Sequence, residues 1–210
     1  MSLPQTVILY TPDEYLELER QATERHEYLD GHIYEMAGES LAHSQICVNL
    51  AGEVRAQLKG RRCQALSPNM KVRTGEKKLF SYPDLTIVCG QTIFHDVQRD
   101  VLLNPTVVFE VLSRSTEGFD RGEKFLRYRN YIETLTDYVL VSQHIPLVEH
   151  YTRREDNRWL MTSLSGLDSV FALPEINCAL RLSEIYDRVE FPPETIDPES
   201  GIYEEPDGEN

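Results

Sequence analysis

The sequence predicts an α/β fold in which a mixed central sheet is flanked by helices, with a further helix and hairpin at the N-terminus. Apolar, β-branched runs of central-strand type, such as residues 106–112, alternate with segments of helical periodicity. Clear helix-start signals and one Asp-Gly turn separate these segments. A chain of 210 residues can bury one substantial core. We therefore expect one domain over residues 1–191.

A helix and a hairpin are the first expected elements. Residues 11–14 read Thr-Pro-Asp-Glu, which places a capping hydroxyl before proline at the first helical position and glutamate at the third. The helix should run to about residue 22. Residues 26–29 and 32–36 read as strands, because Asp-Gly at 30–31 supplies the two positive φ angles of a type I′ turn.

The second helix and the middle of the sheet follow. Ser40 can cap a helix that ends near Gly60. Its apolar residues recur every four positions, at Ile46, Leu50, Val54 and Leu58. Strands are expected at 63–66, 70–73, 84–89 and 106–112. The last two should be central, because they are almost wholly apolar or β-branched.

The C-terminal half continues the α/β pattern. Asp120 and Glu123 have the spacing of another capping box, so we expect a helix to begin there with Phe125, Tyr128 and Ile132 on one side. Further strands are expected at 137–142, 147–152 and 158–163, with a short helix near 183–189. Residues 192–210 form an acidic, proline-rich tail that we expect to be mobile.

The charge distribution bears on possible partners. A net charge of -14 counts against nucleic acid, which is bound through clustered Lys and Arg. However, residues 184–210 hold ten acidic residues and one basic residue, whereas residues 55–78 hold eight basic residues and one acidic residue. The basic segment could meet a phosphate backbone, or it could be a solvated helix end and hairpin.

Cysteine spacing and hydropathy bear on the cell compartment. Cys47, Cys63, Cys89 and Cys178 lack the paired spacing of zinc or redox motifs, so we expect small buried hydrophobes. The apolar runs are far shorter than the roughly 20 residues that cross a bilayer. The N-terminus lacks the pattern of a secretory signal. We therefore expect a cytoplasmic protein with no membrane partner.

Asp84 and Glu110 form the candidate site. Asp84 opens one predicted central strand, and Glu110 lies among apolar residues of the next, where a carboxylate is costly to bury unless it is paired or binds a cation. Side by side, the two would repel by about 4 kcal/mol at roughly 4 Å with an effective dielectric near 20. Mg²⁺ or Mn²⁺ would remove this penalty. The alternative is a strand-edge aspartate with an outward-facing or protonated glutamate.

The ordered motifs resemble the PD-(D/E)XK superfamily of restriction-endonuclease-like folds, and more narrowly its Uma-type branch of bacterial endonucleases. The likeness covers about residues 10–155. It rests on His26-Glu-Tyr-Leu-Asp-Gly, His43, Tyr82-Pro-Asp, Phe109-Glu-Val-Leu-Ser, Asp120-Arg-Gly-Glu-Lys, Arg127-Tyr and Asp137-Tyr-Val-Leu-Val. This resemblance implies a restriction-endonuclease-like sheet and a Mg²⁺-dependent or Mn²⁺-dependent endonuclease with DNA as its substrate.

One position departs from the superfamily motif. Two residues after Glu110 the motif has lysine, and this chain has Leu112. The resemblance implies that Lys124, in the following helix, is a migrated catalytic lysine. The alternative is a solvated helix lysine paired with Asp120 or Glu123.

Further polar residues are candidates for the same site. The resemblance suggests that Glu27 joins Asp84 and Glu110 as a third metal ligand, although alternate residues of a hairpin are often merely solvated. His43 could face the same cleft or simply lie near the helix start. The roles of Ser113, Ser115 and Thr116 stay open between phosphate contact and local hydrogen bonding.

The predicted function is therefore a DNA endonuclease in which Asp84, Glu110 and Glu27 hold Mg²⁺ and Lys124 assists attack by water. The alternative is an inactive module that keeps this fold to bind DNA or protein. A serine hydrolase is disfavoured because no Gly-x-Ser-x-Gly elbow is present. We expect a homodimer, since two-fold dimers are the commonest oligomers and two sites are needed to cut both strands.

Overall fold

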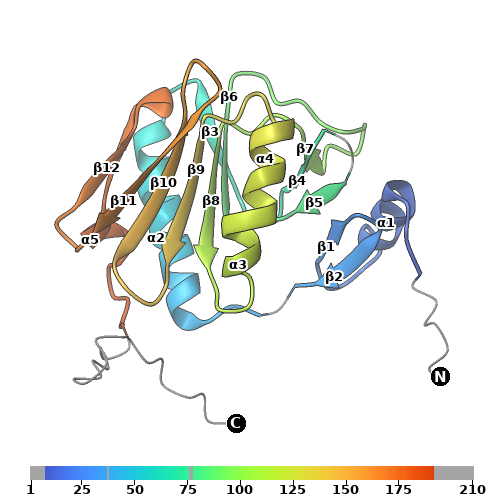
Figure 1. Ribbon diagram of the computed structural model, residues 1–210, viewed down its shortest axis with the longest axis horizontal. Coiled ribbons are helices and arrows are strands. Elements are labelled where there is room, and N and C mark those ends of the chain that lie inside the picture. Colours follow the sequence, from blue (N-terminus) through green and yellow to red (C-terminus); the bar gives the residue numbers. More distant parts are fainter. Residues whose placement is uncertain (1–7, 37, 76–77, 192–210) are drawn as a thin grey trace, which may run out of the picture.

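A computed structural model of the chain, described over residues 8–36, 38–75 and 78–191, contains a mixed six-stranded sheet, a five-stranded sheet and a two-stranded hairpin (Figure 1). The six-stranded sheet has the order β11-β10-β9-β8-β6-β3. Its strands are β3 Cys63–Leu66, β6 Leu85–Cys89, β8 Val107–Leu112, β9 Asp137–Ser142, β10 Leu147–Arg153 and β11 Trp159–Ser165. Strands β8 and β9 are parallel, and the other neighbours are antiparallel. The predicted α/β class with a mixed central sheet is confirmed.

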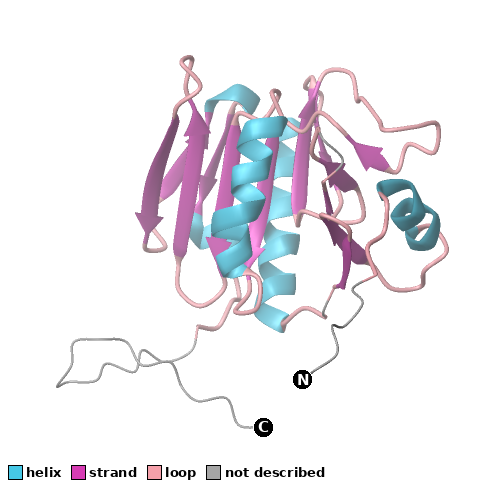
Figure 2. Cartoon of the chain, turned by 45° about the vertical axis from the view of Figure 1, so that its right-hand side comes forward, coloured by secondary structure: helices cyan, strands magenta, loops and turns pink. Residues whose placement is uncertain are grey.

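Helices cover both faces of the six-stranded sheet (Figures 1 and 2). Helix α2, Leu41–Leu58, packs on one face. The two-stranded C-terminal hairpin and helix α5, Leu182–Ile185, pack on the same face. Helix α4, Phe125–Tyr131, packs on the other. Successive residues of β8 divide between the two faces, as alternation along a strand requires. Glu110 has the same parity as Val108 and Leu112, so it belongs to the α4 face.

The five-stranded sheet holds the N-terminal hairpin in the order β2-β1-β5-β4-β7. Its strands are β1 His26–Leu29, β2 His32–Glu35, β4 Lys71–Arg73, β5 Leu79–Ser81 and β7 Val101–Leu102. The predicted type I′ turn is confirmed by φ angles of 47° at Asp30 and 94° at Gly31. Helix α1, Pro12–Glu19, has the predicted capping box but ends before residue 22.

The chain passes from one sheet to the other through Tyr82-Pro83-Asp84. These three residues lie between β5 of the five-stranded sheet and β6 of the six-stranded sheet. Proline donates no backbone hydrogen bond, which suits a residue that belongs to neither ladder. Asp84 is therefore placed at the junction of the two sheets.

Four strands were not predicted from the sequence. Strands β5 and β7 contain only three and two residues, too few for an alternating pattern to be recognised. The C-terminal hairpin, β12 Val170–Leu173 and β13 Cys178–Arg181, does alternate between exposed and buried residues. Its connection is a 3-10 turn at Pro174–Ile176 followed by Asn177 at φ 51°, rather than a standard two-residue turn.

The predicted helix start at Asp120 is wrong. The helical segment begins with α3, Glu117–Phe119, after Thr116, and passes through a π-helical turn at Asp120–Lys124 before α4. Asp120 is only 4% exposed, and its side chain contacts Lys124 instead of capping a helix. Asp120 and Glu123 therefore have the spacing of a capping box, but they do not cap the start of a helix.

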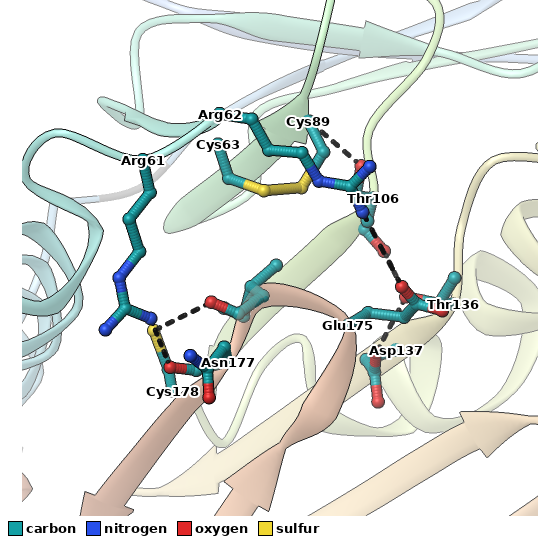
Figure 3. The surroundings of a disulfide bond; sticks show 11 residues. Arg61, Arg62, Cys63, Cys89, Thr106, Thr136, Asp137, Glu175, Asn177 and Cys178 are labelled. Atoms are coloured by element: carbon teal, nitrogen blue, oxygen red, sulfur yellow. Dashed lines mark hydrogen bonds and ion pairs between the residues drawn. A yellow bond between two sulfur atoms is a disulfide. The ribbon is translucent and has the colours of Figure 1, made fainter.

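The expectation that the four cysteines are simply small buried hydrophobes is also wrong. Cys63 and Cys89 form a disulfide between β3 and β6 (Figure 3). The antiparallel register places the two residues directly opposite each other, which spacing along the sequence could not reveal. Cys47 and Cys178 are free thiols, half-buried and buried respectively.

Two other expectations concern the ends and the membrane. The predicted tail at 192–210 lies outside the described residues. Within the described part of the chain, every helix is too short or too polar to span a membrane.

Candidate active site

Asp84 and Glu110 lie side by side on neighbouring strands. The pairing of Leu85 with Phe109 in antiparallel register sets Asp84 beside Glu110. Asp84 Oδ2 accepts the backbone N–H of Val111 at 2.7 Å. This hydrogen bond anchors the aspartate to β8 at the position next to the glutamate.

Glu110 is buried and incompletely satisfied. Its side chain is 5% exposed, and its Oε1 has no hydrogen-bond partner among the described residues. Lys124 Nζ approaches that oxygen to 2.9 Å without the alignment of a hydrogen bond. Burial raises the pKa of Glu110 well above its ordinary value; Lys124 opposes this rise, while Asp120, Asp84 and Glu27 add to it. An added cation would relieve both the burial and the repulsion.

Lys124 lies at the centre of the acidic cluster. Its Nζ is 3.2 Å from Asp120 Oδ1 and 3.6 Å from Glu27 Oε1, in addition to the contact with Glu110. Burial alone would lower the pKa of Lys124, but Glu110, Glu27 and Asp120 raise it well above the ordinary lysine value. The side chain is therefore an ammonium at neutral pH. The π-helical turn places Asp120 and Lys124 both inside, a local geometry that is frequent at functional sites.

Glu27 reaches the cluster from the other sheet. It lies on β1, and its Oε1 accepts the backbone N–H of Tyr82 at 3.0 Å while approaching Lys124. The structure thus brings together all four side chains that the sequence singled out, Asp84, Glu110, Lys124 and Glu27. Lys124 pairs with Asp120 as the alternative interpretation held, but it is buried rather than solvated.

His43 faces the same cluster from α2. Its Nε2 is 3.5 Å from Asp84 Oδ2, while its backbone N–H donates to the Ser40 cap at 3.1 Å. Burial would lower the pKa of His43, but hydrogen bonds to Asp84 and Cys47 raise it to about 11. His43 therefore faces the cluster and also lies at the helix start, as the two interpretations from the sequence described.

Two parts of the site were not predicted as members of it. Asp120 was named only as a cap or a solvated partner of Lys124, and it contacts that lysine inside the buried cluster at 3.2 Å. A buried hydrogen-bond network also lies behind Glu27. The Tyr82 hydroxyl donates to Glu19 Oε1 at 2.6 Å and accepts a hydrogen bond from Lys71 Nζ at 3.2 Å. No sequence pattern indicates this network, because Glu19, Lys71 and Tyr82 come from separate elements.

The basic segment at 55–78 does not form one surface. Lys71 is buried against Asp100, and Arg73 donates to His95. Among the described members, Arg55, Lys59, Arg61 and Arg62 are exposed near the C-terminal end of α2, whereas Lys78 is exposed elsewhere, near Asp30 and Arg127. His43 lies at the other end of that helix, roughly 24 Å from Lys59 at 1.5 Å per residue. Steering of a substrate by the whole segment is therefore not supported by its arrangement.

The loop after β8 satisfies its own hydrogen bonds. Ser113 Oγ contacts Thr116 Oγ1 at 2.8 Å and Ser115 Oγ at 3.2 Å, and it accepts the backbone N–H of Thr116. Of the two interpretations left open, these contacts match local hydrogen bonding.

The donor set fits a hard divalent cation. Asp84, Glu110 and Glu27 offer carboxylate oxygens, which such ions prefer. The buried Oε1 of Glu110 accepts no hydrogen bond from the described residues, but the Lys124 ammonium lies 2.9 Å away, so a metal would have to share this oxygen with it. The chemistry of the three carboxylates therefore suits a divalent cation, which would have to bring their oxygens closer together.

The fold and the site together define a restriction-endonuclease-like protein. Its Pro-Asp pair lies at the junction of two sheets, and a glutamate lies on the adjacent strand.

The chain belongs to the Uma2 family, described as putative restriction endonucleases, whose model matches residues 12–183. The uncharacterized protein sll1609 of Synechocystis is 34% identical over 166 residues, which are 79% of this chain and 93% of that protein. A second uncharacterized Synechocystis protein, slr1290, is 34% identical over 176 residues, or 84% and 90% of the two chains. The predicted Uma-type resemblance is confirmed.

A solved structure supports the fold. The crystal structure of a putative nuclease from Anabaena variabilis matches with a TM-score of 0.69 and covers 84% of this chain and 97% of its own. The two sequences are 17% identical over this match. At that identity the likeness shows a shared fold.

Proposed function

We propose that the protein is a metal-dependent endonuclease that hydrolyses phosphodiester bonds in DNA. The observation that carries this proposal is the buried Glu110 carboxylate beside Asp84, with one oxygen lacking a hydrogen bond and an ammonium 2.9 Å away. Structural carboxylates in a core are normally fully hydrogen-bonded, so this arrangement favours a ligand site. Membership of the Uma2 family supports the nuclease class.

Asp84, Glu110 and Glu27 would hold Mg²⁺ or Mn²⁺. A bound divalent cation supplies a Lewis acid that polarises a phosphoryl oxygen and makes water a stronger nucleophile. Asp84 is fixed by the N–H of Val111, and Glu27 by the N–H of Tyr82, so both carboxylates are already oriented. Such preorganisation lowers the cost of assembling the reacting geometry.

Lys124 would stabilise charge rather than remove a proton. Because its pKa is held above the ordinary lysine value, it carries a proton at the pH where the enzyme would work. An ammonium in a buried site can offset the negative charge that grows on a phosphate in the transition state. Leu112, at the usual lysine position, is 2% exposed and packs in the core against α4, so the charge comes from the helical segment instead.

The second candidate is an inactive nuclease-fold module that binds DNA or protein. Leu112 favours it, because the usual lysine is absent from its strand. Lys124 already pairs with the acids, which also provides a purely structural reason for the cluster.

Cleavage assays separate the two candidates. Single- and double-stranded DNA are incubated with Mg²⁺, Mn²⁺ or EDTA and with wild type, Glu110→Gln or Lys124→Ala. Wild type should cut only with metal, and each variant should lose at least about a hundredfold in rate. Glu155→Gln and Lys59→Ala are matched controls, because both residues are exposed and remote from the cluster. Absence of cutting by wild type under every metal condition would favour the inactive module.

We also propose that the active form on duplex DNA is a homodimer. Two sites related by two-fold symmetry would allow both strands to be cut in one encounter. Sedimentation velocity at the protein concentration of the cleavage assay tests this form, and a monomer that linearises a circular duplex in one step would contradict it.

A further inference from the structure

Three donor side chains converge at the start of α2, beside the carboxylate cluster but outside it. His43 Nδ1 lies 3.1 Å from Glu39 Oε2 and 3.5 Å from Cys47 Sγ. One ligand atom of each residue lies within 4.8 Å of the others. The spacing of four residues from Glu39 to His43 and again to Cys47 sets the three about one turn apart along the same side of the segment.

We propose that Glu39, His43 and Cys47 bind a thiophilic divalent metal ion of the zinc class. Thiolate, imidazole and carboxylate are the donors that Zn²⁺ takes, and three protein ligands leave a fourth position for water. This donor set differs from the all-carboxylate cluster, which suits Mg²⁺. The two sites would therefore select different metals, although they are neighbours.

Two of the three donor separations are close to those of a tetrahedral site. Zn²⁺ bonds of about 2.3 Å to sulfur and about 2.1 Å to nitrogen hold these donors about 3.6 Å apart at the tetrahedral angle, and nitrogen and oxygen donors about 3.4 Å apart. The corresponding separations here are 3.5 Å and 3.1 Å. These two pairs would need adjustments of a few tenths of an ångström, and the sulfur and carboxylate donors lie within 4.8 Å of each other.

The second nitrogen of His43 has the partner that a metal-bound histidine needs. Its Nε2 faces Asp84 Oδ2 at 3.5 Å. A carboxylate on the far nitrogen fixes the tautomer and orients the ring, as in carboxylate–histidine–zinc arrangements. With Nε2–H directed at Asp84, Nδ1 is the nitrogen that would bind the ion, and binding would release the Nδ1 proton to solvent. The side chain of Glu39 is 54% exposed, which provides a route of entry from solvent.

Cobalt binding tests this site directly. Co²⁺ is titrated into the full chain under argon without reductant, so that the Cys63–Cys89 disulfide stays closed. A thiolate-to-cobalt charge-transfer band should appear, with the visible bands of tetrahedral cobalt, and Zn²⁺ should abolish both. Excess Mg²⁺ should leave them unchanged. Cys47→Ser should lose the charge-transfer band, whereas Glu39→Gln should keep it and need more Co²⁺.

Cys178→Ser is the matched control, because Cys178 is the other free thiol and is buried away from His43. It should keep the band. A wild type with no band at saturating Co²⁺ would mean that the three residues are only hydrogen-bonded to one another. A band that survives Cys47→Ser would also overturn the site. Neither readout requires DNA cleavage, so an inactive protein could still pass this test.

Discussion

The hydroxyl of Tyr82 donates a 2.6 Å hydrogen bond to Glu19, a buried carboxylate at the end of α1. Glu19 Oε1 also accepts the backbone N–H of His26, the neighbour of Glu27. The backbone N–H of Tyr82 meanwhile donates to Glu27. The Tyr82–Glu19 and Tyr82–Glu27 hydrogen bonds therefore fix the N-terminal helix and hairpin against the segment that carries Asp84.

Tyr82→Phe should destabilise the fold by about 1–2 kcal/mol, because it leaves one oxygen of a buried carboxylate short of a donor. Urea denaturation followed by fluorescence measures the loss. Tyr34→Phe is the matched control, since Tyr34 is 52% exposed. Equal stabilities of the two variants would show that the Glu19 contact contributes nothing.

Mg²⁺ should raise the melting temperature of wild type, with about 2.7 kcal/mol of stabilisation at a hundred times its dissociation constant. Glu110→Gln should abolish this response. Without metal the same variant should be at least as stable as wild type, because a buried carboxylate costs more than a neutral amide. A large loss of stability in metal-free Glu110→Gln would instead indicate that the Lys124 ion pair stabilises the fold.

Asp100 should make stability depend on pH in the acid range. The Arg20 guanidinium, with help from Lys71, lowers the pKa of Asp100 from 3.8 to about 2. A depressed folded-state pKa gives stability that is complete above about pH 4 and is lost as pH falls toward 2. Asp100→Asn should therefore cost about 1 kcal/mol at neutral pH, after allowance for solvent screening.

The difference between wild type and Asp100→Asn should narrow as pH falls below 4. Denaturation curves of both proteins at several pH values would show this. A difference that stays constant with pH would mean that the side chain acts through packing rather than charge.

The Cys63–Cys89 disulfide should stabilise the protein by about 3 kcal/mol, the usual range for closing a loop of this length. A reductant should lower the melting temperature of wild type but not that of the Cys63→Ala, Cys89→Ala double variant. Thiol titration in denaturant should find Cys47 and Cys178 before reduction and all four cysteines afterwards. An unchanged melting temperature on full reduction would contradict the prediction.

Much of the fold follows from local sequence. Helix α2 and strands β6, β8 and β9 have strong periodicity or long apolar runs, and their predicted bounds agree with the structure to within about two residues. Strands β5 and β7 are held by pairing with neighbours rather than by any pattern of their own. Such strands form because the rest of the sheet is present, so sequence alone does not identify them.

Site residues could be predicted where a charged side chain occurs in a sequence context that is otherwise apolar or otherwise unusual for it. Glu110 stood out because it is a carboxylate in an apolar strand, and Asp84 because it follows proline at a strand start. Asp120 did not, because Asp near a helix start has an ordinary explanation as a cap. The convergence of Glu39, His43 and Cys47 depends on side-chain directions that spacing permits but does not require.

The division of the acidic cluster between two sheets has a consequence for a chain still being synthesised. Glu27 leaves the ribosome early in the N-terminal hairpin, whereas Glu110 and Lys124 follow much later. The charges meet only when the later strands have paired and the hairpin has docked on Tyr82-Pro83-Asp84. In an unfinished chain these charged groups are therefore separate, and the complete cluster would exist only after folding is complete.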